Sequence, residues 1–322
     1  MGLMDDASRL AMPADASAAT GAVQGTGAHG VWPEVPAGFS TRRVNRLRHD
    51  FHRHPLFQLP ALQALAQKLS ATGQCRFIHP GSTQGSAFSH EPTHPLGWSM
   101  AEVFARMEEP ASWLALYNVE TDPAYRDLLE GMVADLRPLI EPEQGAIYKV
   151  TGFMFLSAPP AVTPFHIDRE NNFWLQLHGR KTLNVWQPGD DAVVAPAAVE
   201  EFIASGNLAG VKLREGARAR SLQWDVGPGE GVFFPSTSPH MTCTEDGWTR
   251  PGDGVAVSIG VNFYTDLTLH TARVYQFNRV ARMLGMSPAP PGGSAQRDAI
   301  KAPLGSVLAR LRYRRRRPPF SC

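Results

Sequence analysis

Hydrophobic positions follow two different spacings along the chain, and the spacing changes near residue 146. In Leu59–Leu69 the apolar residues fall at i, i+3, i+4 and i+7, which predicts an amphipathic helix. The segments Ser99–Met107 and Pro123–Leu136 are also predicted to be helical. Residues 73–98, rich in Gly, Ser, Pro and His, indicate an irregular loop between these helices.

After residue 146, short runs of β-branched and aromatic residues replace the helical pattern. The predicted strands are Ile147–Ser157, Asn172–His178, Thr182–Gln187, Ser221–Val226, Gly231–Pro235 and Ala256–Tyr264. Turn sequences such as Gly227-Pro228-Gly229 separate several of them. Several short strands at close spacing favour an antiparallel sandwich or barrel.

Helical patterns return within and after the strands. Ala197–Ser205 is predicted to be a helical insert, and Asp266–Leu284 is predicted to be one long helix that ends at Gly285. A stretch rich in Pro and Gly, a short helix and a run of arginines follow. The apolar stripe of the long helix can pack on the barrel or join two copies of the chain.

These patterns divide the 322 residues into regions, with enough chain for a substantial core. The first region is rich in Ala, Gly and Thr, and it buries too little apolar surface to offset the entropy of ordering. We expect a flexible arm (1–38), a helical region that packs on the barrel (39–145), a strand-rich sandwich or barrel (146–265), a C-terminal helical region (266–309) and a basic tail (310–322).

Composition excludes several classes of protein. With 43% hydrophobic residues the chain is not disordered as a whole, and no apolar run approaches the ~18 residues of a membrane helix. Acidic residues Asp5 and Asp6 stand where a signal peptide needs basic ones. The 3 cysteines are scattered and form no CxxC motif, so we expect a protein of the reducing cytoplasm without a disulfide framework.

The net charge of +1 hides an uneven distribution. Residues 310–317 contain six arginines and no acid, so the rest of the chain carries +1 − 6 = −5. A mildly acidic body therefore ends in a basic tail. Such a tail is suited to bind nucleic acid or an acidic partner.

Candidate chemistry is concentrated in the segment from Thr163 to Asp168. His166 and Asp168 are two residues apart, so in an extended segment both side chains point to the same side. An imidazole and a carboxylate on one face form two thirds of a 2-His-1-carboxylate site, the arrangement that suits non-haem Fe(II). His240, beyond a later predicted strand, is the candidate third ligand. An isolated HxD pair is common by chance, so the neighbouring residues decide.

Those neighbours include a lysine and two amides. Lys181 opens a predicted apolar strand, where an ammonium can hold one end of a dicarboxylate, and Thr163 can add a hydroxyl donor. Asn172 and Asn262 lie in otherwise apolar strands, so each closes a structural hydrogen bond or faces a polar ligand. A dense group of histidines at His49–His54 is interpreted instead as a solvated turn.

The combined pattern resembles a known family. His166-Ile-Asp168, the pair Asn172-Phe173 four residues on, and Gln176-x-x-Gly179-x-Lys181 resemble the core of JmjC-type Fe(II)/2-oxoglutarate oxygenases. The closest resemblance is to bacterial cupin-like proteins and to the asparaginyl hydroxylase that acts on hypoxia-inducible factor. It covers about residues 145–265 and implies a mainly β fold with flanking helices, a double-stranded β-helix (jelly roll) of the cupin/JmjC type.

The resemblance also implies roles for individual residues. His166, Asp168 and His240 would hold Fe(II); Lys181 and Thr163 would bind the C5 carboxylate of 2-oxoglutarate; Asn172 and Asn262 would lie near the metal and the C1 end; and either Tyr117 or Tyr148 would contact the C5 carboxylate. The chain departs from the family in having Pro239, not an aromatic residue, before the distal histidine.

What the resemblance implies is an Fe(II)- and 2-oxoglutarate-dependent dioxygenase. It would hydroxylate a C–H bond of a peptide, protein or small molecule and release succinate and CO2. It also favours a homodimer formed through residues 266–284 over packing of that stripe on the barrel. The alternative is a cupin-fold regulatory or nucleic-acid-associated protein that binds metal without turnover, an interpretation supported mainly by the arginine tail.

Overall fold

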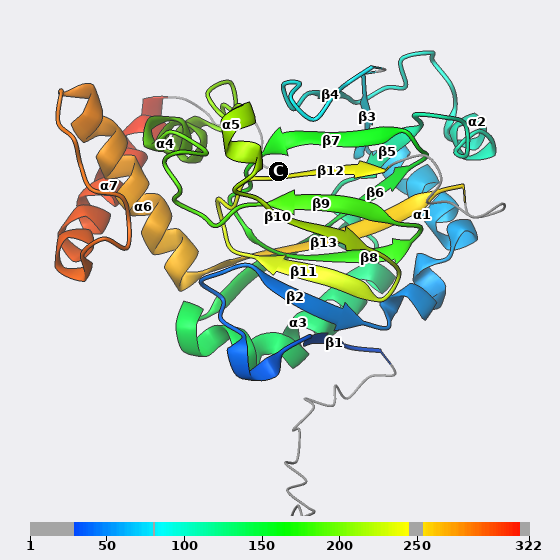
Figure 1. Cartoon of the computed structure of the whole chain (residues 1–322), viewed down its shortest axis with the longest axis horizontal. Helices are drawn as coiled ribbons and strands as arrows, with labels where there is room; N and C mark the ends of the chain where they lie inside the picture. The colour runs from blue at the N-terminus through cyan, green and yellow to red at the C-terminus, as the bar shows by residue number, and fades with distance from the viewer. Residues whose placement is uncertain (1–28, 80, 245–253, 316–322) are drawn as a thin grey trace, which may run out of the picture.

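The computed structural model describes residues 29–79, 81–244 and 254–315 (Figure 1). Within these ranges, none of the helices has the length and apolar character needed to cross a bilayer. Cys75 and Cys243 are free thiols. The cytoplasmic location stays a prediction. Residues 1–28 of the predicted arm and residues 316–322 of the predicted tail lie outside the described ranges.

Two antiparallel sheets form the body of the protein, one of nine strands and one of four. The large sheet has the order β1 (Val31–Pro33), β2 (Asn45–His49), β11 (Glu230–Phe234), β8 (Asn171–His178), β13 (Ala256–Thr265), β6 (Ile147–Ser157), β5 (Trp113–Leu116), β3 (Cys75–Ile78) and β4 (His90–Glu91). The small sheet has the order β10 (Leu222–Val226), β9 (Lys181–Val185), β12 (His240–Thr244) and β7 (Ala161–His166).

Strands β6 to β13 form a double-stranded β-helix. Along the chain they cross between the sheets, so that β6, β8, β11 and β13 lie in the large sheet and β7, β9, β10 and β12 lie in the small one. The predicted fold class, mainly β with flanking helices and a jelly-roll core, is confirmed. The two short strands β7 and β12 were not among the predicted strands, although they carry both candidate histidine ligands.

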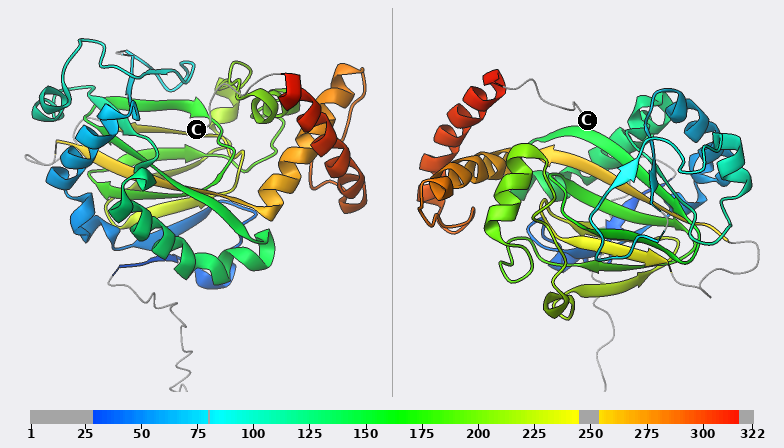
Figure 2. Two further views of the ribbon diagram at one scale, coloured as in Figure 1. Left: turned by 180° about the vertical axis from the view of Figure 1, so that it is seen from behind. Right: turned by 90° about the horizontal axis from the view of Figure 1, so that it is seen from above.

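Helices cover the outer face of the large sheet. They are α1 (Leu59–Ala71), α2 (Met100–Ala105) and α3 (Pro123–Gln144). Helices α1 and α3 lie along the large sheet in the view from behind (Figure 2). Their buried residues, such as Leu65 and Val133, share one apolar core with sheet residues such as Leu156 and Ile259. Helix α3 continues beyond the predicted end at Leu136 through two internal prolines, because its last turns still bury Ile140 and Gln144.

The N-terminal part of the chain is ordered earlier than predicted. Residues 31–38, assigned to the flexible arm, include β1 and a 3-10 turn over Pro36–Gly38. Strand β1 pairs with β2, which in turn pairs with β11 and so extends the barrel sheet. Main-chain hydrogen bonds to the sheet stabilise this segment, and such bonds cannot be predicted from side-chain composition.

The C-terminal region is a pair of helices attached to one end of the barrel. It consists of α6 (Asp266–Met283) and α7 (Ala295–Arg315), with α4 (Pro196–Ser205) and α5 (Glu215–Arg218) close by (Figure 1). Helix α6 packs on both α4 and α7, and it buries Val274, Tyr275 and Ala281. The homodimer through 266–284 stays a prediction. Helix α7 extends over residues 310–315, where we had placed the start of the tail.

The interior of the barrel is apolar at one end and polar at the other. The apolar end is a buried cluster that includes Trp174, Leu183, Val226 and Phe234. At the polar end the sheets separate around a cavity, described next. This difference decides where a polar ligand can enter the barrel.

Candidate metal centre

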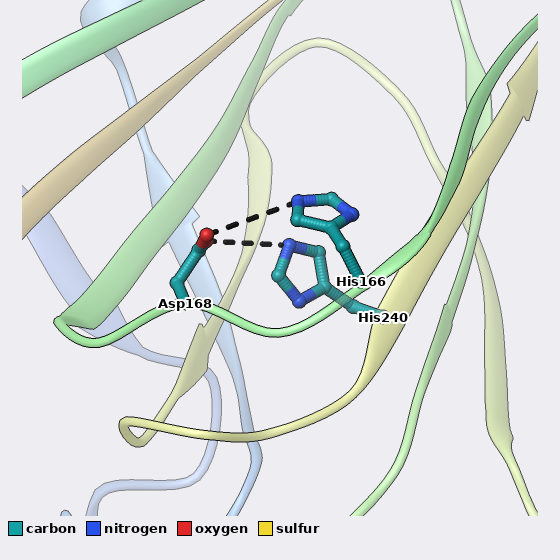
Figure 3. Close-up of side chains that lie close together, drawn as sticks. All are labelled: His166, Asp168 and His240. Carbon is teal, nitrogen blue, oxygen red and sulfur yellow. Dashed lines mark ion pairs between the residues drawn. The ribbon is translucent and has the colours of Figure 1, made fainter. Parts of the chain in front are cut away.

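Two neighbouring strands bring the three candidate ligands together. His166 ends β7 and His240 begins β12, and the two residues face each other in the antiparallel register of the small sheet. Asp168 follows β7 after one residue. Its carboxylate oxygens lie 3.9 Å from His166 Nε2 and 3.5 Å from His240 Nε2 (Figure 3). One ligand atom from each residue lies within 4.8 Å of the others, which is the compact arrangement that a metal ion requires.

Hydrogen bonds fix the tautomer of both imidazoles. His166 Nδ1 lies 2.7 Å from the carbonyl oxygen of Pro164, and His240 Nδ1 lies 3.0 Å from that of Ser238. Because a carbonyl oxygen only accepts, each Nδ1 carries the proton and donates it. Each Nε2 is then left with a free lone pair directed at Asp168. This is the form in which histidine binds a metal.

Burial keeps both histidines neutral, which is the protonation state in which an imidazole binds a metal. Removal from water lowers the pKa of His166 to about 4, with a further contribution from the neighbouring His240. Burial likewise lowers the pKa of His240 to about 4. The same desolvation raises the pKa of the Asp168 carboxyl. This half-buried carboxyl beside two neutral imidazoles lacks a counter-charge that a cation would supply.

The three residues line a cavity of about 800 Å³ between the sheets. Alternate residues of the strands point into it, as the two-residue period of a strand requires. Strand β13 contributes Ser258, Gly260, Asn262 and Tyr264; the other strands contribute Lys149, Phe153, Phe155, Thr163, Asn172, Trp174 and Thr242. The cavity is large enough for a small organic ligand beside the metal position.

Behind one wall of the cavity lies a buried lysine. The Lys181 side chain is only 1% exposed, and its ammonium donates to Ser258 Oγ at 3.1 Å and to the carbonyl oxygen of Phe155 at 3.5 Å. Burial alone lowers its pKa to about 7, and no carboxylate pairs with it among the residues that the structure describes. A buried ammonium with two neutral acceptors has strong remaining affinity for an anion.

The two predicted amides face each other across the centre of the large sheet. Asn172 on β8 pairs with Asn262 on β13, and both line the cavity. In the described part of the chain, the side-chain oxygens of both lack a hydrogen-bond partner. Gly260 makes room for the pair, because a Cβ there would lie 3.0 Å from Asn172 Oδ1 and 3.1 Å from Asn262 Oδ1. These amides therefore have unused hydrogen-bonding capacity directed at the cavity.

The structure separates the two candidate tyrosines. Tyr117, next to the end of β5, lines the cavity, and its hydroxyl lies 3.0 Å from His90 Nε2. Tyr148 is 42% exposed, bonds to Asp266 and is not part of the cavity lining. Of the two residues that the sequence left open, only Tyr117 is placed where it can contact a ligand. Thr163 also lines the cavity, on the strand that carries His166.

Several cavity residues were not identified from the sequence. Phe88, in the loop after β3, stacks on His166 with ring centroids 4.3 Å apart. Helix α4 and the turn after it form an outer wall with Phe202 and Leu208. The hydroxyl of Tyr264 donates to Glu170, a half-buried carboxyl whose pKa is raised by desolvation. Ser258 and Tyr264 were detectable, because they continue the two-residue period of Asn262, whereas loop residues carry no such signal.

Comparisons with known proteins add a limited finding. No protein-family model matches the sequence, and no curated protein sequence matches it. Among solved structures, the chain is similar to the X-ray structure of Escherichia coli YcfD, with a TM-score of 0.42 and 14% identity over 84% of this chain and 65% of that one. It is also similar to YcfD, described as a ribosomal oxygenase from Escherichia coli, in complex with cobalt and 2-oxoglutarate, with a TM-score of 0.36 and 14% identity over 74% of this chain and 57% of that one.

A third similar structure, YcfD in complex with cobalt and succinic acid, has a TM-score of 0.35. The chain covers 57% to 65% of the length of these neighbours, which is less than two thirds. At these values the similarity carries no argument about activity or partners. The fold assignment rests on the strand order, and the assignment of the site rests on its geometry.

Proposed function

We propose that this protein is an Fe(II)- and 2-oxoglutarate-dependent dioxygenase that hydroxylates a C–H bond of a peptide, protein or small molecule. The observation that carries the proposal is the combination of a His-Asp-His set in the cavity with a buried lysine behind its wall that pairs with no carboxylate among the described residues. A metal site alone fits many functions. A metal site with an ammonium group nearby fits a dicarboxylate that binds the metal at one end and the ammonium at the other.

The donor set fits Fe(II). His166, Asp168 and His240 would hold the metal through two neutral imidazole nitrogens and one carboxylate, and three ligands leave further coordination positions for other molecules. The Nδ1 hydrogen bonds to Pro164 and Ser238 hold both rings in place before a metal arrives. Bound Fe(II), with 2-oxoglutarate and O2, supplies the oxidising chemistry that converts R–H to R–OH with release of succinate and CO2.

The polar groups around the cavity fit 2-oxoglutarate. In this proposal Lys181, through its position behind Ser258, and Thr163 hold the C5 carboxylate, and Tyr117 adds a hydroxyl donor. The side-chain amides of Asn172 and Asn262, which line the cavity, would lie near the metal and the C1 end. The apolar end of the barrel, with Trp174 as part of the floor, keeps water away from the ligand.

The remaining space of the cavity would receive the substrate. Its open side is bordered by Phe88, by α4 and by the Glu170–Tyr264 pair. These residues lie on loops and on a helix outside the barrel strands, and such elements usually determine specificity on a rigid scaffold. We therefore place substrate selection there and the chemistry within the barrel.

The proposal is tested by spectroscopy followed by turnover. Fe(II) and 2-oxoglutarate, added without oxygen, should give a visible metal-to-ligand charge-transfer band, and O2 should then yield succinate. The band should be absent in Asp168→Ala. Absence of the band in the unaltered protein would contradict the proposal. A band without succinate, even with a broad set of candidate substrates, would favour the metal-binding protein without turnover.

A further inference from the structure

The segment 81–91, which ends with β4, connects the two sheets beside the cavity. The main-chain carbonyl of Gln84 accepts from the N–H of Phe165, on the outer edge of β7, at 2.9 Å. The side-chain oxygen of Gln84 also accepts from Arg218, on α5, at 2.8 Å. At its other end the segment forms β4, which pairs with β3 at the edge of the large sheet. The segment is therefore fastened to both sheets.

Two rings of this segment reach the cavity. Phe88 stacks on His166, with ring centroids 4.3 Å apart and an angle of 12° between the ring planes. His90 Nε2 lies 3.0 Å from the hydroxyl oxygen of Tyr117. The Phe88 and His90 rings also contact each other edge to face, with centroids 5.5 Å apart. One segment that precedes the double-stranded β-helix thus contacts a metal ligand and the tyrosine that we assign to the C5 carboxylate.

Tyr117 approaches the same part of the cavity as Lys181. Its ring packs on that of Phe153, with centroids 4.9 Å apart, and the Arg76 guanidinium lies 5.5 Å from its centroid. Phe155, two residues further along β6, provides the main-chain carbonyl that accepts from the Lys181 ammonium at 3.5 Å. The phenol and the ammonium therefore both lie against β6, where the proposed function places the C5 carboxylate.

The hydrogen bond between His90 and Tyr117 has a defined direction. Burial is the main cause that lowers the pKa of His90, so its imidazole is neutral at pH 7 and carries one proton. Nδ1 is buried and has no hydrogen-bond partner in the described ranges, and an unpaired N–H is rarer inside proteins than an unused acceptor. We therefore assign the proton to Nε2, which donates to the Tyr117 oxygen. The hydroxyl accepts this bond and keeps its own proton to donate to another group.

We propose that His90 is a positioning residue for 2-oxoglutarate, because it fixes the Tyr117 hydroxyl so that the phenol proton points to the C5 carboxylate. His90 itself would not touch the ligand. A hydroxyl that rotates freely about its C–O bond must be ordered when a ligand binds, and the bond from His90 removes that cost in advance. This role rests on the proposed function, because only a ligand with a second carboxylate offers the Tyr117 proton this acceptor.

The test compares two ligands of the Co(II)-loaded full chain without oxygen. One is 2-oxoglutarate, and the other is 2-oxopentanoate, which has the same 2-oxo acid end and a methyl group in place of the C5 carboxylate. In His90→Phe a ring remains but the N–H is lost, so 2-oxoglutarate should bind about 5–10-fold more weakly while 2-oxopentanoate binds as before. The matched control is His79→Phe, at a histidine that contacts Glu91 and whose side chain is 55% exposed, which should leave both affinities unchanged.

A second set of variants asks whether His90 acts through Tyr117. Tyr117→Phe should weaken 2-oxoglutarate binding by at least as much, and His90→Phe added to it should cause no further loss, because the hydroxyl is already absent. His90→Gln keeps an N–H donor and should bind 2-oxoglutarate more tightly than His90→Phe. Because Phe88 stacks on His166, the Co(II) absorption spectrum before ligand is added checks that the segment has kept its place.

Equal weakening of both ligands in His90→Phe would indicate a purely structural role and overturn the proposal. So would an unchanged affinity for 2-oxoglutarate in His90→Phe, a further loss in the double variant, or no gain in His90→Gln. These outcomes leave the proposed function intact as long as the unaltered chain binds 2-oxoglutarate more tightly than 2-oxopentanoate. An unaltered chain that binds both equally, or neither, would contradict the proposed function itself and the role of His90 with it.

Discussion

Two regions of this protein are rich in histidine, and only one is arranged to bind a metal. At the cavity, His166 and His240 donate from Nδ1 to main-chain carbonyls and direct both free Nε2 atoms at one carboxylate. Near the N-terminus, His49 uses Nε2 for the carbonyls of Gln176 and Glu230, and His178 uses Nε2 for that of Phe57. There the rings stack edge to face and fasten the chain to the sheet.

The contrast concerns which nitrogens remain free and whether they converge. In the N-terminal group the free nitrogens point to no common centre, and the described residues contain a single His/Asp group with metal geometry, the one at the cavity. The sequence interpretation of His49–His54 as a solvated turn is wrong for His49, which is only 3% exposed. The described His49–His54 residues also do not form a group with the geometry of a metal site. In this protein the number of histidines in a segment does not indicate a metal site, whereas the convergence of their free ring nitrogens on one point does.

The largest expected difference between the two regions is in metal binding. Asp168→Ala removes the charged ligand and should reduce Fe(II)- and 2-oxoglutarate-dependent succinate formation to background. His52→Gln, in the N-terminal group, should leave both activity and metal affinity unchanged. Anaerobic titration with Co(II), followed by absorption, measures affinity directly. Equal losses of affinity in both variants would remove the distinction between the regions.

For the free energy of unfolding, we expect the larger effect from the N-terminal histidine group. His49→Ala removes a buried ring and its hydrogen bonds, at a cost of about 2–4 kcal/mol in the free energy of unfolding, and should leave metal affinity unchanged. Urea denaturation measures the stability. A loss of metal affinity with unchanged stability would contradict the structural role of His49.

Burial of His49 should also make the stability of the protein depend on pH. Burial lowers the pKa of His49 to about 4 in the folded protein, below the ordinary value of 6.5. The unfolded chain therefore binds this proton more tightly, and stability falls as the pH decreases from about 6.5 to about 4, by up to about 3 kcal/mol for this group. Denaturation of His49→Gln over this range should show a shallower decline than the unaltered protein. Parallel declines would exclude the effect.

A smaller effect is expected from the lysine beside the metal position. Lys181→Met keeps the apolar stem but removes the ammonium, and should weaken 2-oxoglutarate binding by about 10–100-fold because a charge-assisted hydrogen bond is lost. Co(II) affinity without 2-oxoglutarate should stay the same. Since the pKa of Lys181 in the free protein is about 7, affinity for 2-oxoglutarate should also fall as pH rises above 7. A pH-independent affinity would argue against this residue as the carboxylate ligand.

The smallest expected effect concerns the amide pair. Gly260→Ala places a methyl group 3.0–3.1 Å from the Asn172 and Asn262 side chains, so the amides must shift by a few tenths of an ångström. We expect a few-fold weaker 2-oxoglutarate binding and an almost unchanged Co(II) affinity. Gly216→Ala, at a position with no atom within 4 Å of the new methyl, is the matched control. Equal behaviour of the two variants would show that the amides do not contact the ligand.

The sequence predicted the long elements well, because their periodicity is strong. The run Ile147–Ser157 matches β6 in full, and the helix predicted from Asp266 matches α6 to within one residue. Strand β7 was missed because Pro164 argues against a strand. It is tolerated because β7 is the edge strand of the small sheet, where a missing N–H breaks no ladder. The HxD spacing predicted the cluster of His166 and Asp168 without knowledge of that strand.

Other features depend on tertiary contacts that no local pattern records. The stacking of Phe88 on His166 comes from a loop in contact with a strand far along the chain. The choice between Tyr117 and Tyr148 depends on which strand face points inward, and a shift of one residue would reverse it. That no carboxylate in the described part of the chain pairs with Lys181 is a property of the packed barrel as well. Local sequence thus indicates the chemistry, and packing decides which residues reach it.

The wall made by α4 has a consequence for how the protein can be altered. The segment between β9 and β10 packs in a cluster of its own on the outer face of the barrel, with Phe202 and Ile203 against Trp186 and Tyr275. Strands β7, β9 and β12, which carry His166, Lys181 and His240, pair with one another and not with this segment. If the proposed function holds, exchange of α4 and the turn after it is a route to engineered variants with new substrate ranges on an unchanged metal site.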